Sequence, residues 1–125
     1  MTPGRCLIAA LIFFTLMVAI GAIPGEAKIL SDAAGDKLLH FSAYAFLSCL
    51  VYSGLTGSPV SRALRTQLAI VLLGGLDEAI QTFMPYRNAN VTDWAFDIAA
   101  ALLTTTAMAL LTRTRTMAKQ RLDRH

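Results

Sequence analysis

Charged residues are scarce in this sequence. They make up 15% of its 125 residues, whereas a soluble domain averages about 25%. The shortage accompanies a hydrophobic fraction of 55% and a mean hydropathy of +0.55. A chain of this length is expected to form a single domain. Few charges and long apolar runs argue against a large soluble core and favour a membrane as the surrounding solvent.

Cysteine and histidine are also rare, with two of each in the chain. Cys6 and Cys49 lie inside apolar segments, so we expect two small buried hydrophobes rather than a disulfide framework or a zinc ligand pair. Two histidines without a ligand-spaced motif give little support to a metal centre. We therefore predict no metal and no cofactor.

The sequence does contain four apolar segments close to the length of a transmembrane helix, which is about 20 residues. They are Cys6–Ile23, Leu38–Leu55, Leu64–Met84 and Trp94–Thr112. Turn-forming residues separate them, for example Gly57-Ser58-Pro59. We predict an all-α fold, an integral membrane bundle of four transmembrane helices over residues 1–112, followed by a basic cytoplasmic tail, residues 113–125. A cleaved signal peptide is the alternative for the first segment, although its apolar run exceeds the usual one of about 7–15 residues.

The basic residues orient the predicted bundle. Eight lie on one side, namely Arg5, Arg62, Arg65, Arg113, Arg115, Lys119, Arg121 and Arg124, and three on the other, Lys28, Lys37 and Arg87. Lys and Arg are enriched in cytoplasmic loops, so both termini are expected in the cytoplasm. The tail has no interleaved aromatic residues, which favours attraction to anionic lipid over nucleic-acid binding. We predict no nucleic-acid partner.

Acidic residues occur inside the third apolar segment. Gly74, Asp77, Glu78 and Gln81 share an arc about 100° wide on a helix. An acid within a membrane span costs roughly 2.5–3.5 kcal/mol on insertion scales. These side chains must therefore face protein or water rather than lipid.

The second and fourth segments carry matching polar faces. In the second, Asp36, His40, Tyr44, Ser48 and Tyr52 recur every four residues, with Lys37 beside the first. In the fourth, Asp93 and Asp97 are followed on the same face by Ala100, Ala101 and Thr104, small residues that let helix backbones approach closely. Arg87, in the short third loop, suits a carboxylate or an anionic ligand. We expect these faces to converge on one site at the outward end of the bundle.

Each of these residues has a plainer interpretation. Asp36, Lys37, Arg87 and Asp93 could be solvated loop charges, and Asp93 could cap the helix that follows it. His40 could be a packing residue, and Glu78 with Gln81 could form a purely structural hydrogen bond between helices. For Tyr44 and Ser48 packing is favoured over chemistry.

Two stretches, "DKLLHFSAY" and "DEAIQTFMPYRNANVTDWAFD", resemble the VanZ-like membrane proteins. That family has Asp-Lys-x-x-His-x-x-x-Tyr, then Asp-Glu-x-x-Gln-x-x-x-Pro-x-Arg, then an Asp followed four residues later by Asp or Asn. The resemblance covers roughly residues 36 to 100. One departure is Ala100, where the family usually has glycine, so a tight helix contact there is in doubt. The positions that match are Asp36, Lys37, His40, Tyr44, Asp77, Glu78, Gln81, Pro85, Arg87, Asp93 and Asp97.

The resemblance implies a multi-pass protein of the bacterial cytoplasmic (inner) membrane. The family takes its name from a protein associated with resistance to teicoplanin, and the activity of its members is largely unassigned. The chain carries no sign of a linked resistance system, so a role in drug resistance does not follow. Whether the protein is an enzyme stays open.

The first functional hypothesis is binding or modulation of an anionic lipid or a lipid-linked cell-envelope precursor. Lys37, His40 and Arg87 would bind the anionic group, while Glu78, Gln81 and Asp93 orient it. The predicted partners are thus membrane lipids or such a precursor, with a homo-oligomer as a further candidate. The predicted binding residues are Asp36, Lys37, His40, Tyr44, Asp77, Glu78, Gln81, Arg87, Asp93 and Asp97.

The alternative is a membrane enzyme acting on a lipid-linked envelope intermediate, with His40 and Glu78 in acid–base roles. Burial lets a carboxylate exchange protons near neutral pH. A metal held by His40, Glu78, Asp93 and Asp97 ranks lower, because no ligand-spaced motif is present. Proton-coupled transport ranks last, since four short spans would need an oligomer to form a pathway.

Overall fold

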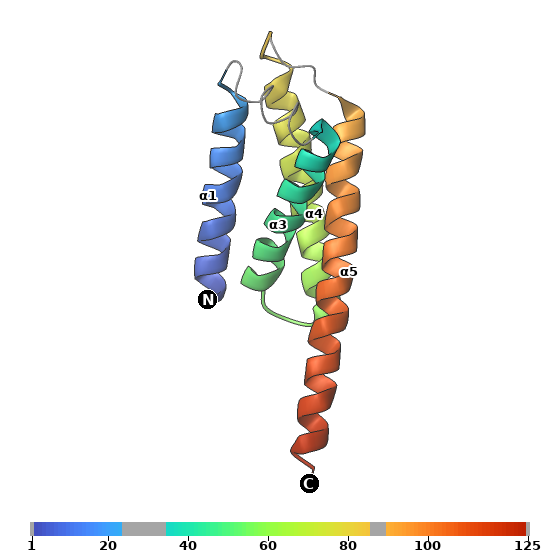
Figure 1. Cartoon of the computed structure of the whole chain (residues 1–125). Coiled ribbons are helices and arrows are strands. Elements are labelled where there is room, and N and C mark those ends of the chain that lie inside the picture. Colours follow the sequence, from blue (N-terminus) through green and yellow to red (C-terminus); the bar gives the residue numbers. More distant parts are fainter. Residues whose placement is uncertain (1, 24–34, 86–89, 125) are drawn as a thin grey trace.

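The chain is helical throughout the part that the structure describes. This computed structural model describes residues 2–23, 35–85 and 90–124, and for Asp36 the backbone alone. Within these ranges there are four helices and no strand: α1 (Pro3–Gly21), α3 (Asp36–Gly54), α4 (Pro59–Gln81) and α5 (Val91–Leu122) (Figure 1). The predicted all-α class is confirmed. Helix α5 runs ten residues beyond the predicted end at Thr112, so most of the basic tail is helix.

Short polar and glycine-containing sequences end one helix and begin the next. Gly57 has φ +115°, a left-handed conformation that glycine adopts without strain. The Ser58 side chain then accepts a hydrogen bond from the Ser61 backbone N–H at 3.2 Å and caps α4, whose first residue is Pro59. The turn predicted at these three residues is confirmed.

Helix α5 begins with a different cap from the one considered above. The Asn90 side-chain oxygen accepts a hydrogen bond from the backbone N–H of Thr92 at 2.9 Å. Asp93 is therefore not the N-cap, because it lies inside the first turn of α5 and is 4% exposed. Its burial also excludes the interpretation of Asp93 as a solvated loop charge.

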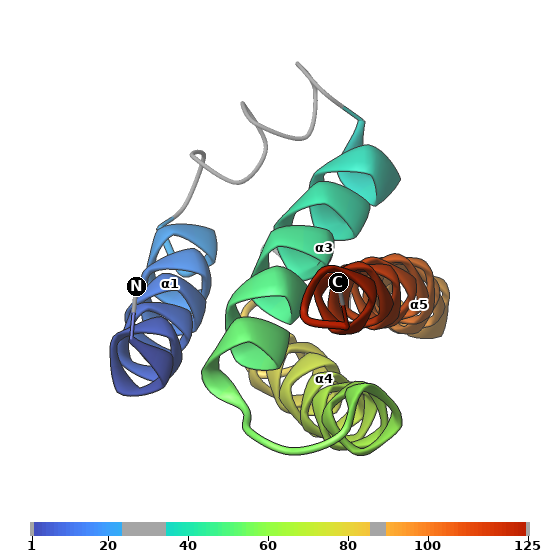
Figure 2. The same ribbon diagram turned by 90° about the horizontal axis from the view of Figure 1, so that it is seen from below.

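Helix α3 has the central position in the bundle. It lies between α1 and α5 when the molecule is seen along its length (Figure 2). Helix α4 packs mainly on α5. Helix α1 packs mainly on α3. At the crossing of α1 and α3 a Cβ on Gly54 would lie 2.6 Å from Cγ of Leu7, so the glycine permits this close approach.

The core is small and lies where α3, α4 and α5 meet. Leu47, Ile70, Ala100 and Ala101 are fully buried there. The outer surface, by contrast, exposes large hydrophobic side chains on every helix, including Leu11 at 67%, Leu72 at 64% and Leu103 at 62%. Ala100, at the position where the family resemblance has glycine, fits into the core without exposure.

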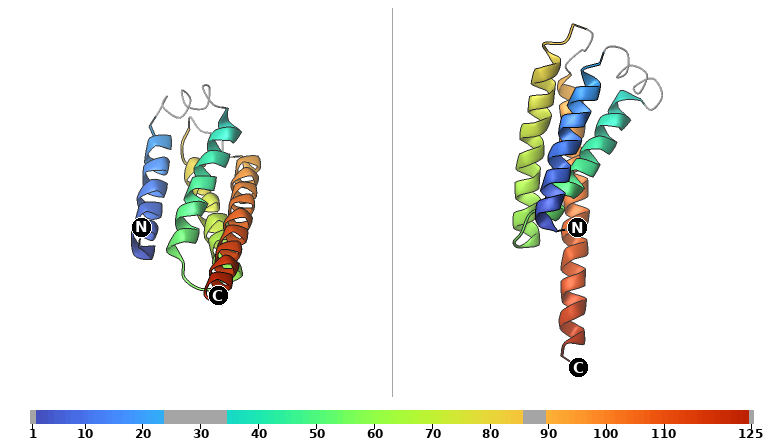
Figure 3. Two further views of the ribbon diagram at one scale, coloured as in Figure 1. Left: turned by 60° about the horizontal axis from the view of Figure 1, so that its bottom comes forward. Right: turned by 90° about the vertical axis from the view of Figure 1, so that its left-hand side faces the viewer.

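Two of the described helices, α1 and α5, are long and apolar enough to cross a membrane. An N-terminal signal sequence or the core helix of a soluble protein can satisfy the same criterion of length and composition. Helices α3 and α4 carry most of the buried polar side chains and do not meet it. Helix α5 also extends well past the other three at its C-terminal end (Figure 3).

Candidate functional site

A cluster of buried polar side chains occupies the end of the bundle opposite the two termini. There α3 begins, α4 ends and α5 begins (Figure 1). Most of the predicted site residues that the structure describes come together at this end. Those that are buried are His40, Tyr44, Asp77, Gln81, Asp93 and Asp97, and Glu78 is partly buried.

His40 and Asp97 connect α3 to α5. Nδ1 of His40 lies 3.1 Å from Oδ1 of Asp97, and the two side chains are 8% and 0% exposed. A carboxylate at this distance favours the proton on Nδ1 and fixes the plane of the imidazole ring. The ring nitrogen Nε2 is then the one that suits an acceptor role or a ligand.

Tyr44, one turn further along α3, connects that helix to α4. Its hydroxyl donates a hydrogen bond to Oδ2 of Asp77 at 3.3 Å. Its ring lies nearly parallel to that of His40, with centroids 6.2 Å apart. Ser48 donates to the Tyr44 backbone carbonyl at 2.6 Å, so this hydroxyl is satisfied within its own helix. Tyr44 is thus a polar contact between helices as well as a packing residue.

Glu78 lies at the edge of the cluster and is only half satisfied. Its Oε2 accepts a hydrogen bond from the backbone N–H of Asn90 at 2.8 Å. Its Oε1 is buried and has no hydrogen-bond partner, and the same is true of Oδ2 of Asp97. Orphaned buried oxygens are uncommon in proteins, because each forfeits the hydrogen bonds that it would make in water.

Possible ligand atoms from three helices gather at the same end of the bundle. One atom each from His40, Glu78 and Asp93 lies within 4.8 Å of the other two. The three residues come from α3, α4 and α5 respectively. Imidazole and carboxylate groups at such separations can bind a metal ion, exchange a proton or orient a polar ligand.

The cationic residues predicted for the site are placed less deeply. Lys37 is exposed, and its Nζ lies 5.5 Å from the centroid of the Phe96 ring, a cation–π contact between α3 and α5. Arg87 and the side chain of Asp36 lie outside the described residues. Pairing of Arg87 with a carboxylate or an anionic ligand therefore stays a prediction.

Several contacts that position the cluster were not predicted from the sequence, although Gly74 was placed on the polar arc of α4. A Cβ on Gly74 would lie 2.9 Å from Cδ1 of Trp94 and 3.1 Å from Oδ2 of Asp97, so glycine is needed where α4 meets α5. The Trp94 indole N–H donates to the Val71 carbonyl at 3.1 Å across the same interface. Gln67 makes a similar contact through Nε2 to the Ile98 carbonyl at 3.3 Å. Gln67 lies about two helical turns before Gly74 on the same side of α4. Extending the polar arc towards the start of the helix would therefore have identified it.

The cluster is rich in negative groups. Among the described residues it combines four carboxylates, Asp77, Glu78, Asp93 and Asp97, with one imidazole, while the Lys37 ammonium is exposed at the surface. Like charges at close range in a poorly solvated site repel strongly. Protons or positive groups beside these carboxylates would offset part of this charge.

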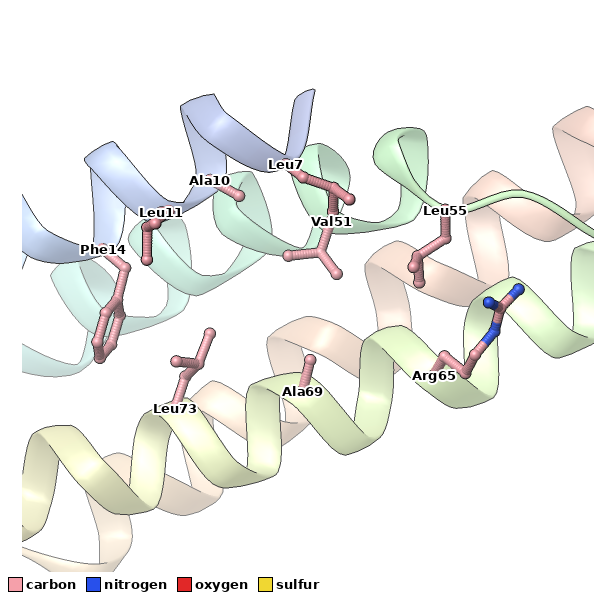
Figure 4. Close-up of a pocket in the computed structure, with 9 residues that line it drawn as sticks. All are labelled: Leu7, Ala10, Leu11, Phe14, Val51, Leu55, Arg65, Ala69 and Leu73. Carbon is pink, nitrogen blue, oxygen red and sulfur yellow. The ribbon is translucent and has the colours of Figure 1, made fainter. Parts of the chain in front are cut away.

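A cavity of about 290 Å³ lies in an apolar part of the bundle, and Figure 4 shows the residues that line it. It lies between α1, α3 and α4, and apolar side chains such as Phe14, Val51 and Leu73 line it. Arg65 is the one charged residue among its lining residues, and its guanidinium donates to the backbone carbonyls of Thr56 and Ser61. This cavity is separate from the polar cluster.

Comparison with known proteins identifies a relative in fission yeast. The chain is 33% identical over 122 residues to a protein of the fission yeast Schizosaccharomyces pombe described as "Uncharacterized protein C11E3.10". The match covers 92% of this chain and 71% of the relative. No protein-family model matches the chain, and no solved structure matches it.

Proposed function

Because the chain belongs to the same family as the fission yeast protein C11E3.10, whose description states no activity, we propose a function from the chain's own site. The protein is a small multi-span membrane protein that binds the anionic headgroup of a lipid or lipid-linked component at the end of the bundle opposite its termini. The observation that carries this proposal is the convergence of buried polar side chains from α3, α4 and α5 at that end. The resemblance of the chain to VanZ-like proteins rests on the same residues.

We propose that all four helices insert, and the positions of the polar groups support this. The acids of α4 and the polar stripe of α3 face the bundle interior, while Leu38, Leu68 and Leu72 face outward. A helix with inward polar groups can cross a bilayer once neighbouring helices satisfy those groups. Both termini then lie on one side, and the basic end of α5 favours the cytoplasm. The relative is eukaryotic, which gives no support to a bacterial inner membrane in particular.

Lys37 is the described group best placed to meet an anionic headgroup. Its ammonium is exposed at the rim of the cluster, beside the aromatic ring of Phe96. The carboxylates beneath it repel a phosphate, so the headgroup binds at the rim and its hydroxyls or amides reach the acids. Arg87, by its position in the sequence, would add a second cation. A second copy of the chain as a partner remains a prediction from the sequence.

Lipid co-purification tests this proposal. The full chain is extracted in a mild detergent, and bound lipids are identified by mass spectrometry from wild type, Lys37→Ala and Arg87→Ala. We expect an anionic lipid that is enriched over the bulk membrane with wild type and depleted with both variants. Thr92→Ala is the matched control, since it shortens an exposed side chain at the same end of the bundle and removes no positive charge. Equal lipid recovery from all four proteins would refute the proposal.

Acid–base chemistry on the bound lipid is the second candidate. It is favoured by the His40–Asp97 pair, which orients the imidazole, and by the uncompensated Oε1 of Glu78 nearby. Replacing Glu78 by Gln retains shape and hydrogen bonding but removes titration. If a cellular phenotype survives Glu78→Gln and is lost with Arg87→Ala, binding is favoured. Loss with both variants favours the enzyme.

A further inference from the structure

The polar cluster gathers several groups that can bind a cation. Four carboxylates converge there with one imidazole, and His40 pairs with Asp97. Lys37 is exposed at the rim and contacts Phe96. Carboxylates that lie this close to one another commonly coordinate a cation.

The donor atoms lie close enough together to converge on one metal ion. His40, Glu78 and Asp93 each offer one ligand atom within 4.8 Å of the others, and they come from three different helices. Two ligands of one tetrahedral zinc ion lie about 3.4 Å apart, given metal–ligand bonds of about 2.1 Å. A shift of the three side chains by roughly an ångström, within rotamer adjustment, therefore brings them to coordinating distance.

A further observation supports a ligand beside these donors. The Oε1 atom of Glu78, one of the three donor residues, is buried and has no hydrogen-bond partner. A buried oxygen without a partner loses the hydrogen bonds that it would make in water, and a bound cation would offset that loss.

Asp97 orients His40 and is not itself one of the metal ligands. Metal-binding histidines usually donate their other ring N–H to a carboxylate, which orients the ring and raises its basicity. The 3.1 Å contact between Nδ1 of His40 and Oδ1 of Asp97 is such a contact. It leaves Nε2 as the nitrogen that coordinates. Asp97 is therefore a positioning residue for His40.

The geometry points to a divalent metal site made by His40, Glu78 and Asp93, with Asp97 orienting the histidine. One imidazole and two carboxylates suit Zn²⁺ or Mn²⁺, and the general order of affinities places Zn²⁺ above Mn²⁺. This inference goes beyond the proposed function, because the cation binds with or without a lipid. Three protein ligands leave coordination positions open, and the hydroxyls of the headgroup would reach these positions if the proposed function holds.

Direct metal binding to the full chain in detergent tests the site. The protein carries a tag without histidine, is stripped with a chelator and is titrated with Zn²⁺, Mn²⁺ and Mg²⁺ by calorimetry. Co²⁺ is titrated in parallel, and its visible absorption spectrum reports the ligand geometry. We expect one ion per chain, with Zn²⁺ tightest, and a Co²⁺ spectrum that changes when His40 is replaced.

Variants separate a metal site from a structural cluster. His40→Ala and Glu78→Gln should each weaken Zn²⁺ binding at least about 10-fold, and Asp97→Asn about 10–100-fold as a supporting group. Gln67→Ala is the control, because it removes a contact between α4 and α5 outside the cluster and should bind Zn²⁺ as wild type does. Far-UV circular dichroism checks folding, and Glu78→Gln retains the side-chain shape if His40→Ala does not fold.

The outcomes distinguish this inference from the proposed function. No saturable Zn²⁺ or Mn²⁺ binding by wild type, or unchanged affinity in both His40→Ala and Glu78→Gln, would overturn the metal site. The lipid experiment is repeated on chelator-stripped protein. Metal binding without lipid enrichment would overturn the lipid proposal alone, and lipid enrichment without metal binding would overturn the metal site alone.

Discussion

Nδ1 of His40 lies 3.1 Å from Oδ1 of Asp97, although the two residues are 57 positions apart in the chain. The contact joins the start of α3 to the start of α5 in a place where both side chains are shielded from solvent. It defines the end of the bundle on which the functional proposals depend.

This pair should show strong energetic coupling. His40→Ala leaves Asp97 buried with neither oxygen satisfied, whereas the double variant His40→Ala/Asp97→Ala removes both groups. We expect the double variant to lose less stability than the sum of the single variants, with a coupling energy of about 0.5–3 kcal/mol. Unfolding of the chelator-stripped protein in detergent micelles measures it. Additive losses would contradict a direct interaction.

Gly74 and Gly75 form a matched pair for testing the contact between α4 and α5. A Cβ on Gly74 would lie 2.9 Å from the Trp94 ring and 3.1 Å from Asp97, whereas on Gly75 the nearest atom is 3.9 Å away. Gly74→Ala should destabilise the bundle by about 1–3 kcal/mol through overpacking. Gly75→Ala should be neutral or stabilise by up to about 1 kcal/mol, because alanine favours helix. Equal effects in thermal unfolding would show that the helices do not approach closely at Gly74.

Arg62 ties the last turn of α3 to α4. Its Nε and Nη2 donate to the Tyr52 carbonyl at 3.1 and 2.7 Å, and its guanidinium lies 4.1 Å from the centroid of the Tyr52 ring. Lysine retains the charge but cannot make the paired hydrogen bonds or the planar stacking. Arg62→Lys should therefore cost about 1–2 kcal/mol in chemical denaturation. Arg115→Lys, at an exposed position, should change stability by less than about 0.5 kcal/mol.

Reporter fusions test the four-span arrangement. A reporter that is active only outside the cytoplasm should be silent after Arg124 and in the turn at Gly57, and active in the segment between α1 and α3. Cysteine labelling at positions 77, 78 and 81 should be slow, because these side chains face the bundle. A strong outside signal after Arg124 would reverse the topology, and fast labelling at all three positions would remove α4 from the membrane.

Much of the fold could be predicted because its causes are local. The turn at Gly57-Ser58-Pro59 follows from a left-handed glycine, a capping serine and a proline at the first helical position. The polar stripes on α3 and α4 follow helical periodicity, so they indicated which side chains share a face. A run of charged residues ends a membrane span, so the sequence predicts that the fourth segment ends at Thr112. Charged residues do not end a helix, however, and α5 continues through the basic residues to Leu122.

The site itself depends on contacts that no local pattern contains. Glu78 accepts a hydrogen bond from the backbone N–H of Asn90. Because every residue except proline has this donor, the residue type at position 90 does not predict the contact. The close approach at Gly74 depends on where the Trp94 ring falls on a neighbouring helix. The donors of the inferred metal site lie 38 and 15 positions apart along the chain, so a search for ligand spacing could not detect them.

The length of α5 has a mechanical consequence. Its 32 residues span about 48 Å, while the hydrocarbon layer of a bilayer is about 30 Å thick. Asp93 and Asp97 near one end and Arg121 near the other thus belong to a single stiff rod. If the tilt of α5 changes slightly where it meets α3 and α4, the C-terminal end of the helix is displaced sideways. The displacement grows with the distance from the point of rotation, so it is largest near Arg121.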